Sequence, residues 1–334
     1  MKPRRIAHAN VVIIFVVAGA LAAAALLAAS TRAALSGEVI VASDTTLGKR
    51  AVMSAVDGSG LTAVDCGGDL TQGGQPRYFV HAQATGGTYP DGRPVAELFS
   101  YGEDCDSPTQ LTSDPMLERV EARWSPNGLR IAFGGTRFDM AGQVVERGIF
   151  VGDVTLGLDG RPLAITNERL AVALAIEQVI PSWAGDSVRV AYALNLGTPA
   201  APQYDLFVAD VDTHAVTNVT GSPTVSEFQP AFSPVANRLA FVRQTSKGGV
   251  FRNDVFVLDL STGRIGQVTS KATANAAQIG HPSWSPDGAD IAFSGWSVSG
   301  GKSDVYRIPA DGRTKARNLT GSFPDNYAAP LWRR

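Results

Sequence analysis

Apolar and polar residues alternate along most of the chain in short runs that end at turns. The clearest example lies between His281 and Phe293. A short strand ends at Trp284, the turn Ser285-Pro286-Asp287-Gly288 follows, and a second strand contains Ile291-Ala292-Phe293. Proline presets φ and glycine accepts positive φ, so this pattern predicts a β-hairpin.

The same hairpin recurs along the chain. Its first strand ends in an aromatic residue at Trp124, Trp183, Phe232 and Trp284, and these positions are 59, 49 and 52 residues apart. Each aromatic is followed by a second apolar strand, namely Arg130-Ile131-Ala132-Phe133, Arg189-Val190-Ala191-Tyr192, Arg238-Leu239-Ala240-Phe241 and Asp290-Ile291-Ala292-Phe293. A repeat of this length is typical of a unit with four strands.

A second pattern supports the same period. A third strand follows in each unit, at Gly148-Ile149-Phe150-Val151, Asp205-Leu206-Phe207-Val208, Asp254-Val255-Phe256-Val257 and Asp304-Val305-Tyr306-Arg307. A short fourth strand then ends in an aliphatic residue and threonine, at Ile165-Thr166, Val219-Thr220, Val268-Thr269 and Leu319-Thr320. The same ending occurs earlier, at Leu70-Thr71 and Leu111-Thr112. Six endings predict six units.

The first and last parts of the repeat array complement each other. The first unit lacks its aromatic strand, and Ala329-Pro330-Leu331-Trp332 supplies one at the other end of the sequence. An open array would expose an apolar face at each end, whereas a closed ring covers both. We therefore predict an all-β, six-bladed β-propeller over residues 37–334, closed by a C-terminal innermost strand and preceded by one N-terminal hydrophobic helix. The expected blades are 37–72 with 325–334, 73–113, 119–168, 176–221, 226–270 and 278–321, with Pro76-Arg77-Tyr78 as the first strand of the second.

These motifs resemble those of the TolB-type β-propeller repeat. The resemblance rests on Pro-x-Trp-Ser-Pro-Asp-Gly-x-x-Ile-Ala-Phe, on the Asp-Val-Tyr strand and on the Leu-Thr ending, and it covers residues from about 37 to 334. It implies the propeller fold and says little about function, because related propellers occur in peptidases and lyases. The family's namesake has an additional N-terminal α/β domain, which residues 1–36 are too short to provide.

The N-terminal 35 residues are typical of a targeting segment and not of a propeller strand. Lys2, Arg4 and Arg5 precede an uncharged run at 11–29, which as a helix of 1.5 Å per residue is about long enough to cross a bilayer. We expect either a cleaved signal peptide or an N-terminal membrane anchor, with residues beyond 35 extracytoplasmic, periplasmic or at the cell surface. Any membrane contact is expected only through residues 11–29.

Charge and cysteine content reduce the range of partners and sites that we expect. The four basic residues of segment 1–35 leave 25 basic and 31 acidic side chains for the rest of the chain, so nucleic acid is not an expected partner. Cys66 and Cys105 are the only cysteines. In an exported protein they predict one disulfide, with two free thiols as the alternative, and they do not form a zinc motif.

Most residues that could suggest a chemical role are expected to have a structural role instead. The repeated aromatics, which include Trp332, are expected to pack between blades. Asp287, Asn127 and Asp186 are expected to stabilise turns rather than to bind calcium. Asp205, Asp254 and Asp304, which precede the third strands, are expected to belong to the scaffold.

The histidines give the strongest argument for an enzyme. His214 is expected in a solvated outer turn, whereas His81 and His281 could share a central channel with a metal ion. The sequence has no Gly-x-Ser-x-Gly motif and no phosphate-binding glycine loop before a helix. We predict no catalytic residue, no metal site and no cofactor.

The loops that enter each innermost strand remain as the candidate binding face. They carry Gln75, Arg77, Glu121, Arg123, Gln178, Glu227, Gln229, Gln278, His281, Asn326 and Tyr327. Loops held on a rigid scaffold often bind ligands. We therefore predict a monomeric, non-enzymatic binding or scaffold protein that recognises a protein, a peptide or a cell-envelope polymer. The alternative is a metal-dependent enzyme, lyase-like or hydrolase-like, or a small-ligand sensor that uses the channel.

Overall fold

The computed structural model describes twelve segments of the chain: 39–43, 50–53, 62–64, 71–72, 78–102, 108–176, 179–198, 200–247, 249–269, 276–297, 302–322 and 327–332. The predictions for the N-terminal segment 1–35 and for the cysteines at 66 and 105 fall outside these ranges. Within these segments, no helix has the length and apolar character that a membrane span requires.

The strands form four-stranded antiparallel sheets, in which the strands follow one another from the innermost to the outermost position. The first sheet contains β24 (Tyr327–Trp332), β1 (Val39–Ser43), β2 (Arg50–Met53) and β3 (Thr62–Val64). The second contains β4 (Thr71–Gln72), β5 (Phe79–Thr88), β6 (Pro94–Tyr101) and β7 (Thr109–Gln110). The third contains β8 (Leu117–Trp124), β9 (Arg130–Phe138), β10 (Val144–Leu156) and β11 (Pro162–Ala173).

The remaining three sheets repeat this order. The fourth contains β12 (Ser182–Trp183), β13 (Arg189–Asn195), β14 (Tyr204–Asp210) and β15 (Val216–Asn218). The fifth contains β16 (Ser226–Phe232), β17 (Arg238–Lys247), β18 (Val250–Asp259) and β19 (Arg264–Gln267). The sixth contains β20 (Ala276–Trp284), β21 (Asp290–Ser297), β22 (Ser303–Pro309) and β23 (Arg317–Asn318).

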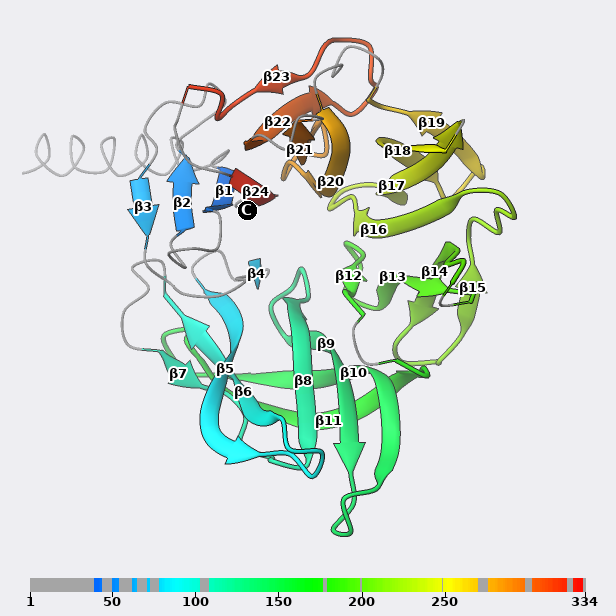
Figure 1. Ribbon diagram of the computed structural model, residues 1–334. Coiled ribbons are helices and arrows are strands. Elements are labelled where there is room, and N and C mark those ends of the chain that lie inside the picture. Colours follow the sequence, from blue (N-terminus) through cyan, green and yellow to red (C-terminus); the bar gives the residue numbers. More distant parts are fainter. Residues whose placement is uncertain are drawn as a thin grey trace, which may run out of the picture.

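The predicted all-β class is confirmed, and the five sheets from β4 to β23 have the arrangement of a propeller. Figure 1 shows them following one another around the molecule in sequence order. C-terminal β24 pairs with β1, where Val39 is opposite Trp332 and Ser43 is opposite Tyr327.

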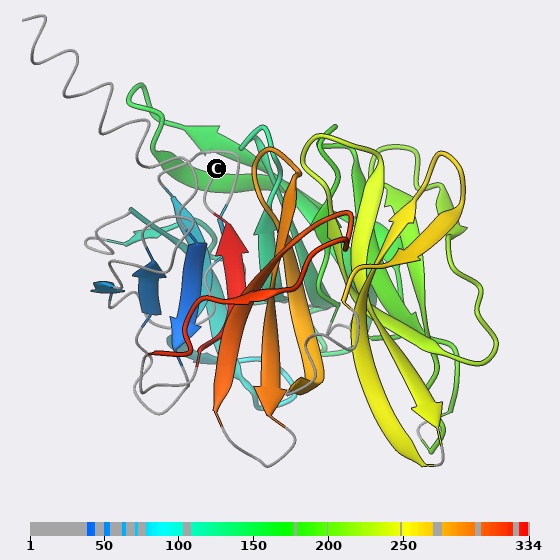
Figure 2. The same cartoon turned by 90° about the horizontal axis from the view of Figure 1, so that it is seen from above.

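The strand directions define two faces of the ring. Each innermost strand ends at its aromatic residue on what we call the turn face, where the turn into the second strand lies. The second and third strands are joined by a hairpin at the opposite end, which we call the loop face. Figure 2 shows β17 and β18 (yellow) and β21 and β22 (orange) extending toward that same side of the molecule.

The aromatic residues pack between sheets, as predicted. Trp124 is buried with Ile131, Phe133 and Phe150 of its own sheet and with Val80 and Leu98 of the sheet before it. Two indoles also bond to the preceding sheet. Trp183 Nε1 donates to the Arg123 carbonyl over 3.0 Å, and Trp284 Nε1 donates to the Ala231 carbonyl over 2.9 Å. Packing and hydrogen bonding therefore join neighbouring sheets at the same repeat position.

The turn aspartates serve the turns, also as predicted. Asp287 Oδ1 accepts from Ser285 Oγ at 2.6 Å and from the Ala289 amide at 3.0 Å. Asn127 Oδ1 accepts the equivalent bonds from Ser125 Oγ and the Leu129 amide at 2.7 and 3.0 Å. A local acceptor for turn amides explains why Asp or Asn occupies this position.

The prediction for the second unit was wrong in one detail. Its innermost strand is β4, so Thr71 opens the second sheet rather than ending the first unit. The Pro76-Arg77-Tyr78 stretch is not that strand; Tyr78 directly precedes β5, and the other two residues are outside the described segments. Phe79 and Val80, both buried, begin the second strand instead.

The third sheet is longer than its sequence predicted. Strand β11 continues beyond Thr166 and the expected boundary at residue 168 to reach Ala173. Its Ile165 amide donates to the Leu111 carbonyl of the second sheet over 2.8 Å, and His214 of the fourth sheet lies 2.9 Å from the Ala171 carbonyl. Because it contacts both neighbours, β11 links three consecutive sheets.

Candidate functional site

Four of the innermost strands, β8, β16, β20 and β24, share a bulge three residues before their final aromatic. The register with the second strand shifts between Val120 and Arg123 in β8, and equivalent shifts occur in β16 and β20. The residue inside each bulge has a positive φ: Glu121 (53°), Gln229 (53°), His281 (54°) and, in β24, Ala329 (50°). Left-handed backbone is unfavourable for residues other than glycine, so the surrounding ladder must enforce it.

The bulge in β8 presents a charged pair. Arg123 Nη2 donates to Glu121 Oε2 over 3.0 Å, and both side chains are partly exposed. The neighbouring Ala122 and Trp124 are buried between sheets. In Figure 1 the innermost strands, β8 among them, lie nearest the centre of the ring.

The bulges of β16 and β20 contact each other. Gln229 Oε1 accepts a hydrogen bond from the His281 amide over 2.8 Å, and the His281 ring lies 5.9 Å from the Trp296 ring, centroid to centroid. Gly280 fits this contact because a Cβ there would lie 3.0 Å from Gln229 Oε1 and 3.3 Å from the Trp296 ring. The predicted residues Gln229 and His281 are therefore held side by side, but inside β16 and β20 and not in the loops that enter these strands, as the sequence had predicted.

Two residues predicted for the binding face, Glu227 and Tyr327, are buried in the interior instead, which corrects the sequence-based assignment. Glu227 is fully buried, and its Oε1 accepts from Arg243 Nη2 at 2.7 Å and from Ser222 Oγ at 3.0 Å. Tyr327 is buried as well. Both residues lie five positions before the strand's aromatic, a position that faces the neighbouring sheet, as Ile279 does in β20.

Of the other residues predicted for the binding face, Gln278 lies in the described segments and four do not. Gln278 is exposed, and its Oε1 accepts from Asn253 Nδ2 over 2.7 Å. Gln75, Arg77, Gln178 and Asn326 lie outside the described segments. The binding role of the set stays a prediction.

The histidines do not form the arrangement that a channel metal would need. His81 lies in β5, the second strand of its sheet, and not in an innermost strand. His214 is in the exposed β14–β15 turn, as expected. Within the described segments, no group of three or more His, Cys, Asp or Glu side chains could hold a metal ion.

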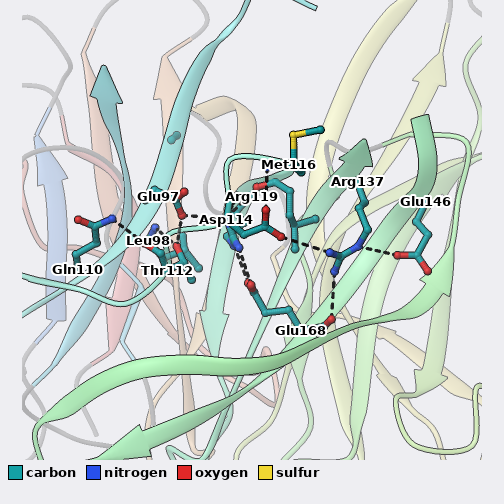
Figure 3. Close-up of polar contacts among 12 residues, drawn as sticks. Glu97, Leu98, Gln110, Thr112, Asp114, Met116, Arg119, Arg137, Glu146 and Glu168 are labelled. Atoms are coloured by element: carbon teal, nitrogen blue, oxygen red, sulfur yellow. Dashed lines mark hydrogen bonds and ion pairs between the residues drawn. The ribbon is translucent and has the colours of Figure 1, made fainter. Parts of the chain in front are cut away.

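Sequence reasoning missed a buried charge cluster between the second and third sheets (Figure 3). Arg119 of β8 has no exposed surface. Its guanidinium donates to Glu97 Oε2 at 2.9 Å, to Glu168 Oε1 at 2.6 Å and to the Leu117 carbonyl at 2.8 Å. Burial alone would lower the pKa of Arg119, but the paired Glu168 and Glu97 carboxylates outweigh it and raise that pKa.

Glu97 completes the buried part of this cluster. Its Oε2 accepts from Thr112 Oγ1 at 2.5 Å as well as from Arg119. Burial raises the pKa of Glu97, because its hydrogen bond to Thr112 and its attraction to Arg119 only partly offset the loss of solvation. One cation, Arg119, therefore contacts two carboxyl groups, those of Glu97 and Glu168.

The cluster extends outward to the loop face. Arg137 Nε donates to Glu146 Oε2 over 2.9 Å, and Arg137 Nη1 lies 3.4 Å from Asp114 Oδ2 (Figure 3). Arg93, in the β5–β6 hairpin, pairs with Glu118 of β8. The loop face at this boundary thus carries partly exposed charges of both signs. In the sequence, the one sign of this cluster is Arg119 itself, which stands at the strand position where β20 has the apolar Ile279.

Repeated four-stranded sheets joined by interior aromatics define a β-propeller, and the comparisons with known proteins identify its family. The model of the TolB beta propeller domain (PD40) matches residues 166–333. The chain belongs to this family, which confirms the resemblance seen in its motifs. Among curated proteins, no relative matches.

Solved structures with the same fold have diverse functions. TolB from Acinetobacter baumannii is similar with a TM-score of 0.64 and 14% identity, over 90% of this chain and 67% of that one. Hydrazine synthase from Kuenenia stuttgartiensis has a TM-score of 0.58 and 9% identity, over 88% of this chain and 46% of that one. Prolyl oligopeptidase B from Galerina marginata has a TM-score of 0.50 and 13% identity, over 87% and 40%. At such identities the likeness shows the fold alone.

Proposed function

We propose that the chain is an exported, six-bladed propeller, closed by β24 on β1, that binds a protein, a peptide or a cell-envelope polymer through its loop face and performs no bond chemistry. The observation that carries this proposal is the set of bulges in β8, β16 and β20, which lie within the innermost strands that begin at the loop face. They hold Glu121, Gln229 and His281 in strained conformations.

The cost of these bulges favours a functional interpretation. A non-glycine residue with positive φ costs on the order of 1–3 kcal/mol, and such residues cluster at binding sites. The strained residues Glu121, Gln229 and His281 are polar and partly exposed, and Arg123 adds a cation beside Glu121. An acid, a base, an amide and an imidazole on rigid strands suit the recognition of polar groups.

The proposed extracytoplasmic location of the protein rests on its N-terminal segment. The proposal includes export by residues 1–35, either as a cleaved signal or as an anchor through residues 11–29. It also includes a monomeric chain without a cofactor.

The test begins with affinity capture from the native envelope, using the full chain as bait. Binding of the captured partner is then measured for the wild type, H281A, Q229A and the turn-face control V235A. We expect at least a tenfold loss of affinity for H281A and Q229A and no change for V235A. Unfolding curves identify any variant that fails to fold, and H281N then replaces it.

Two results would contradict the proposal. One is unchanged affinity in folded H281A and Q229A. The other is cleavage of polysaccharides or peptides by the purified protein that disappears in H281A. A stoichiometric metal detected by elemental analysis would likewise favour the metal-dependent alternative.

A further inference from the structure

Trp296 differs from the other tryptophans of the chain in its exposure and in its place in the repeat. All five tryptophans lie in described segments, and Trp296 is the one that is partly exposed. It lies near the loop-face end of β21, twelve residues after the repeat aromatic Trp284. The residues twelve positions after the aromatics of the third, fourth and fifth sheets are Thr136, Asn195 and Gln244. Because three sheets have a polar residue at this position, the fold does not require an aromatic side chain there.

Three side-chain amides form a chain of hydrogen bonds at the same end of the fifth and sixth sheets, where β20 packs against β17 and β18. Gln244 Nε2 donates to Asn253 Oδ1 over 3.1 Å, and Asn253 Nδ2 donates to Gln278 Oε1 over 2.7 Å. Asn253 is buried, whereas Gln278 is exposed. The buried amide therefore orients the exposed one, and the Nε2 group of Gln278 supplies two donors.

Trp296 lies beside this chain of amides. Gln278 and Trp296 are directly opposite each other in β20 and β21, so both side chains stand on the same side of the sixth sheet. That side faces the fifth sheet, because Gln278 contacts Asn253. A Cβ on Gly280 would lie 3.3 Å from the Trp296 ring and 3.0 Å from Gln229 Oε1, so the amide of Gln229 is close as well. We call Gln229, Gln244, Asn253, Gln278 and Trp296 the amide–indole cluster.

The members of the amide–indole cluster carry no formal charge, and the arginines that adjoin them in sequence are already paired. Arg243 Nη2 lies 2.7 Å from Glu227 Oε1, and Arg252 Nε lies 2.7 Å from Asp254 Oδ2. Anionic ligands are recognised by cations that form charge-assisted hydrogen bonds with them. Since these two cations have carboxylate partners within the protein, the cluster favours an uncharged ligand.

We propose that the amide–indole cluster binds a neutral carbohydrate of the cell envelope, with one sugar ring stacked on Trp296 and its hydroxyl groups bonded to the amide of Gln278. This inference rests on the proposed function and names its ligand class. The electron-rich face of an indole attracts the C–H groups on one face of a sugar ring. Each sugar hydroxyl is both a donor and an acceptor, and a primary amide is the same. Rigid strands that hold both groups together suit this ligand.

A peptide is the alternative ligand, and the strand pairing around Trp296 argues against it. Peptides that bind to sheets do so by hydrogen bonding to the backbone of an unpaired edge. Trp296 stands on β21, which is paired with β20 on one side and with β22 on the other. Strand β21 therefore offers an incoming peptide no free edge, whereas a stacked sugar needs only the side chains.

The test uses the full chain in a detergent without a sugar headgroup. Calorimetry measures its binding to a panel of neutral tetrasaccharides, built from hexoses or from N-acetylhexosamines, at millimolar concentrations. We expect at least one to bind. W296Q copies Gln244, which the fifth sheet has at the same position, and should weaken binding at least tenfold. Q278A should weaken it several-fold. The matched control is Q143A, which changes an exposed glutamine of the β9–β10 hairpin and should have no effect.

Tryptophan fluorescence adds a readout that a structural role of Trp296 would not change. The bound sugar should alter the emission of the wild type and not that of W296F, because the other four tryptophans are buried. W296F keeps a ring face and should bind within threefold of the wild type.

Three results would overturn the carbohydrate assignment. They are the absence of binding to every member of the panel, unchanged binding in folded W296Q, and an emission change that persists in W296F. If H281A then weakens the binding of a captured protein partner and W296Q does not, the proposed function stands and only the carbohydrate assignment fails. If neither variant weakens the binding of any captured partner, both fail.

Discussion

Thr320 Oγ1 donates a hydrogen bond to Asp304 Oδ1 over 2.9 Å, although the two residues are sixteen positions apart. The same hydroxyl accepts from the Val305 amide at 3.0 Å. Thr269 and Asp254 repeat this arrangement in the fifth sheet, and Thr112 and Glu97 repeat it in the second. The aliphatic-Thr ending therefore closes each of these blades by binding an acidic residue within its third strand.

The first prediction concerns this clamp. Thr269 is fully buried, donates to Asp254 and accepts from the Val255 amide, each at 2.9 Å. T269V keeps the shape and removes both bonds, so we expect a loss of about 1–3 kcal/mol in the free energy of unfolding. Urea titration provides the measurement. T217V, at an exposed position of β15, is the control and should change little. Equal stability of the two variants would refute the clamp.

The clamp shows which parts of the fold the sequence could predict. Asp254, Asp304 and their threonines recur at a fixed spacing, and so do Trp284 and Asp287, because their contacts repeat from blade to blade. Arg119 contacts Glu97 in another sheet and Glu168 in an unusually long strand, and no repeat records those pairings. Glu227 was predicted for the binding face because its half-buried partner, Arg243, lies on a different strand. Sequence periodicity predicts what repeats, whereas contacts unique to one boundary require the structure.

Arg119 supports the second prediction. R119M would leave Glu97 and Glu168 without their buried cation, and breaking a buried pair in this way costs about 3–5 kcal/mol. R137M removes a partly exposed arginine of the same cluster and should cost no more than about 1 kcal/mol. Denaturant unfolding compares the two. Adding E97Q and E168Q to R119M should restore part of the lost free energy of unfolding. If nothing is restored, the unpaired carboxylate charges are not the cause of the loss.

Glu97 makes the stability of this boundary depend on pH. Burial raises the pKa of Glu97 above its value in the unfolded chain. Its stabilising contribution is then fully present below the unfolded pKa of about 4.3 and is lost as the pH rises through the folded pKa. The free energy of unfolding of the wild type, minus that of E97Q, should therefore decrease as the pH is raised from acid toward neutral. A difference that increases over this range would contradict the assignment.

Asp287 should show the opposite dependence. Its hydrogen bonds from Ser285 and the Ala289 amide lower the pKa of this carboxyl group. The contribution of Asp287 is therefore present above its unfolded pKa and is lost as the pH falls through the lower, folded pKa. D287N copies Asn127, which makes the same bonds in the third sheet. We expect thermal unfolding of D287N to resemble the wild type in acid and to occur at a slightly lower temperature near neutral pH. An identical difference at all pH values would rule out this role of the charge.

The last prediction separates backbone strain from side-chain function at the bulges. Ala329 has a φ of 50° and is the one bulge residue without a polar side chain among those described, so its replacement changes only the backbone preference. Glycine tolerates this conformation, whereas an L-residue pays about 1–2 kcal/mol for it, so A329G should stabilise the protein by up to about 1 kcal/mol. A328G, at the preceding position, which does not have positive φ, should destabilise it by about 0.5–1 kcal/mol. Chemical unfolding of both variants measures the difference. If A329G proves as destabilising as A328G, the bulges are not strained, and the energetic argument for Glu121, Gln229 and His281 as a recognition site falls with them.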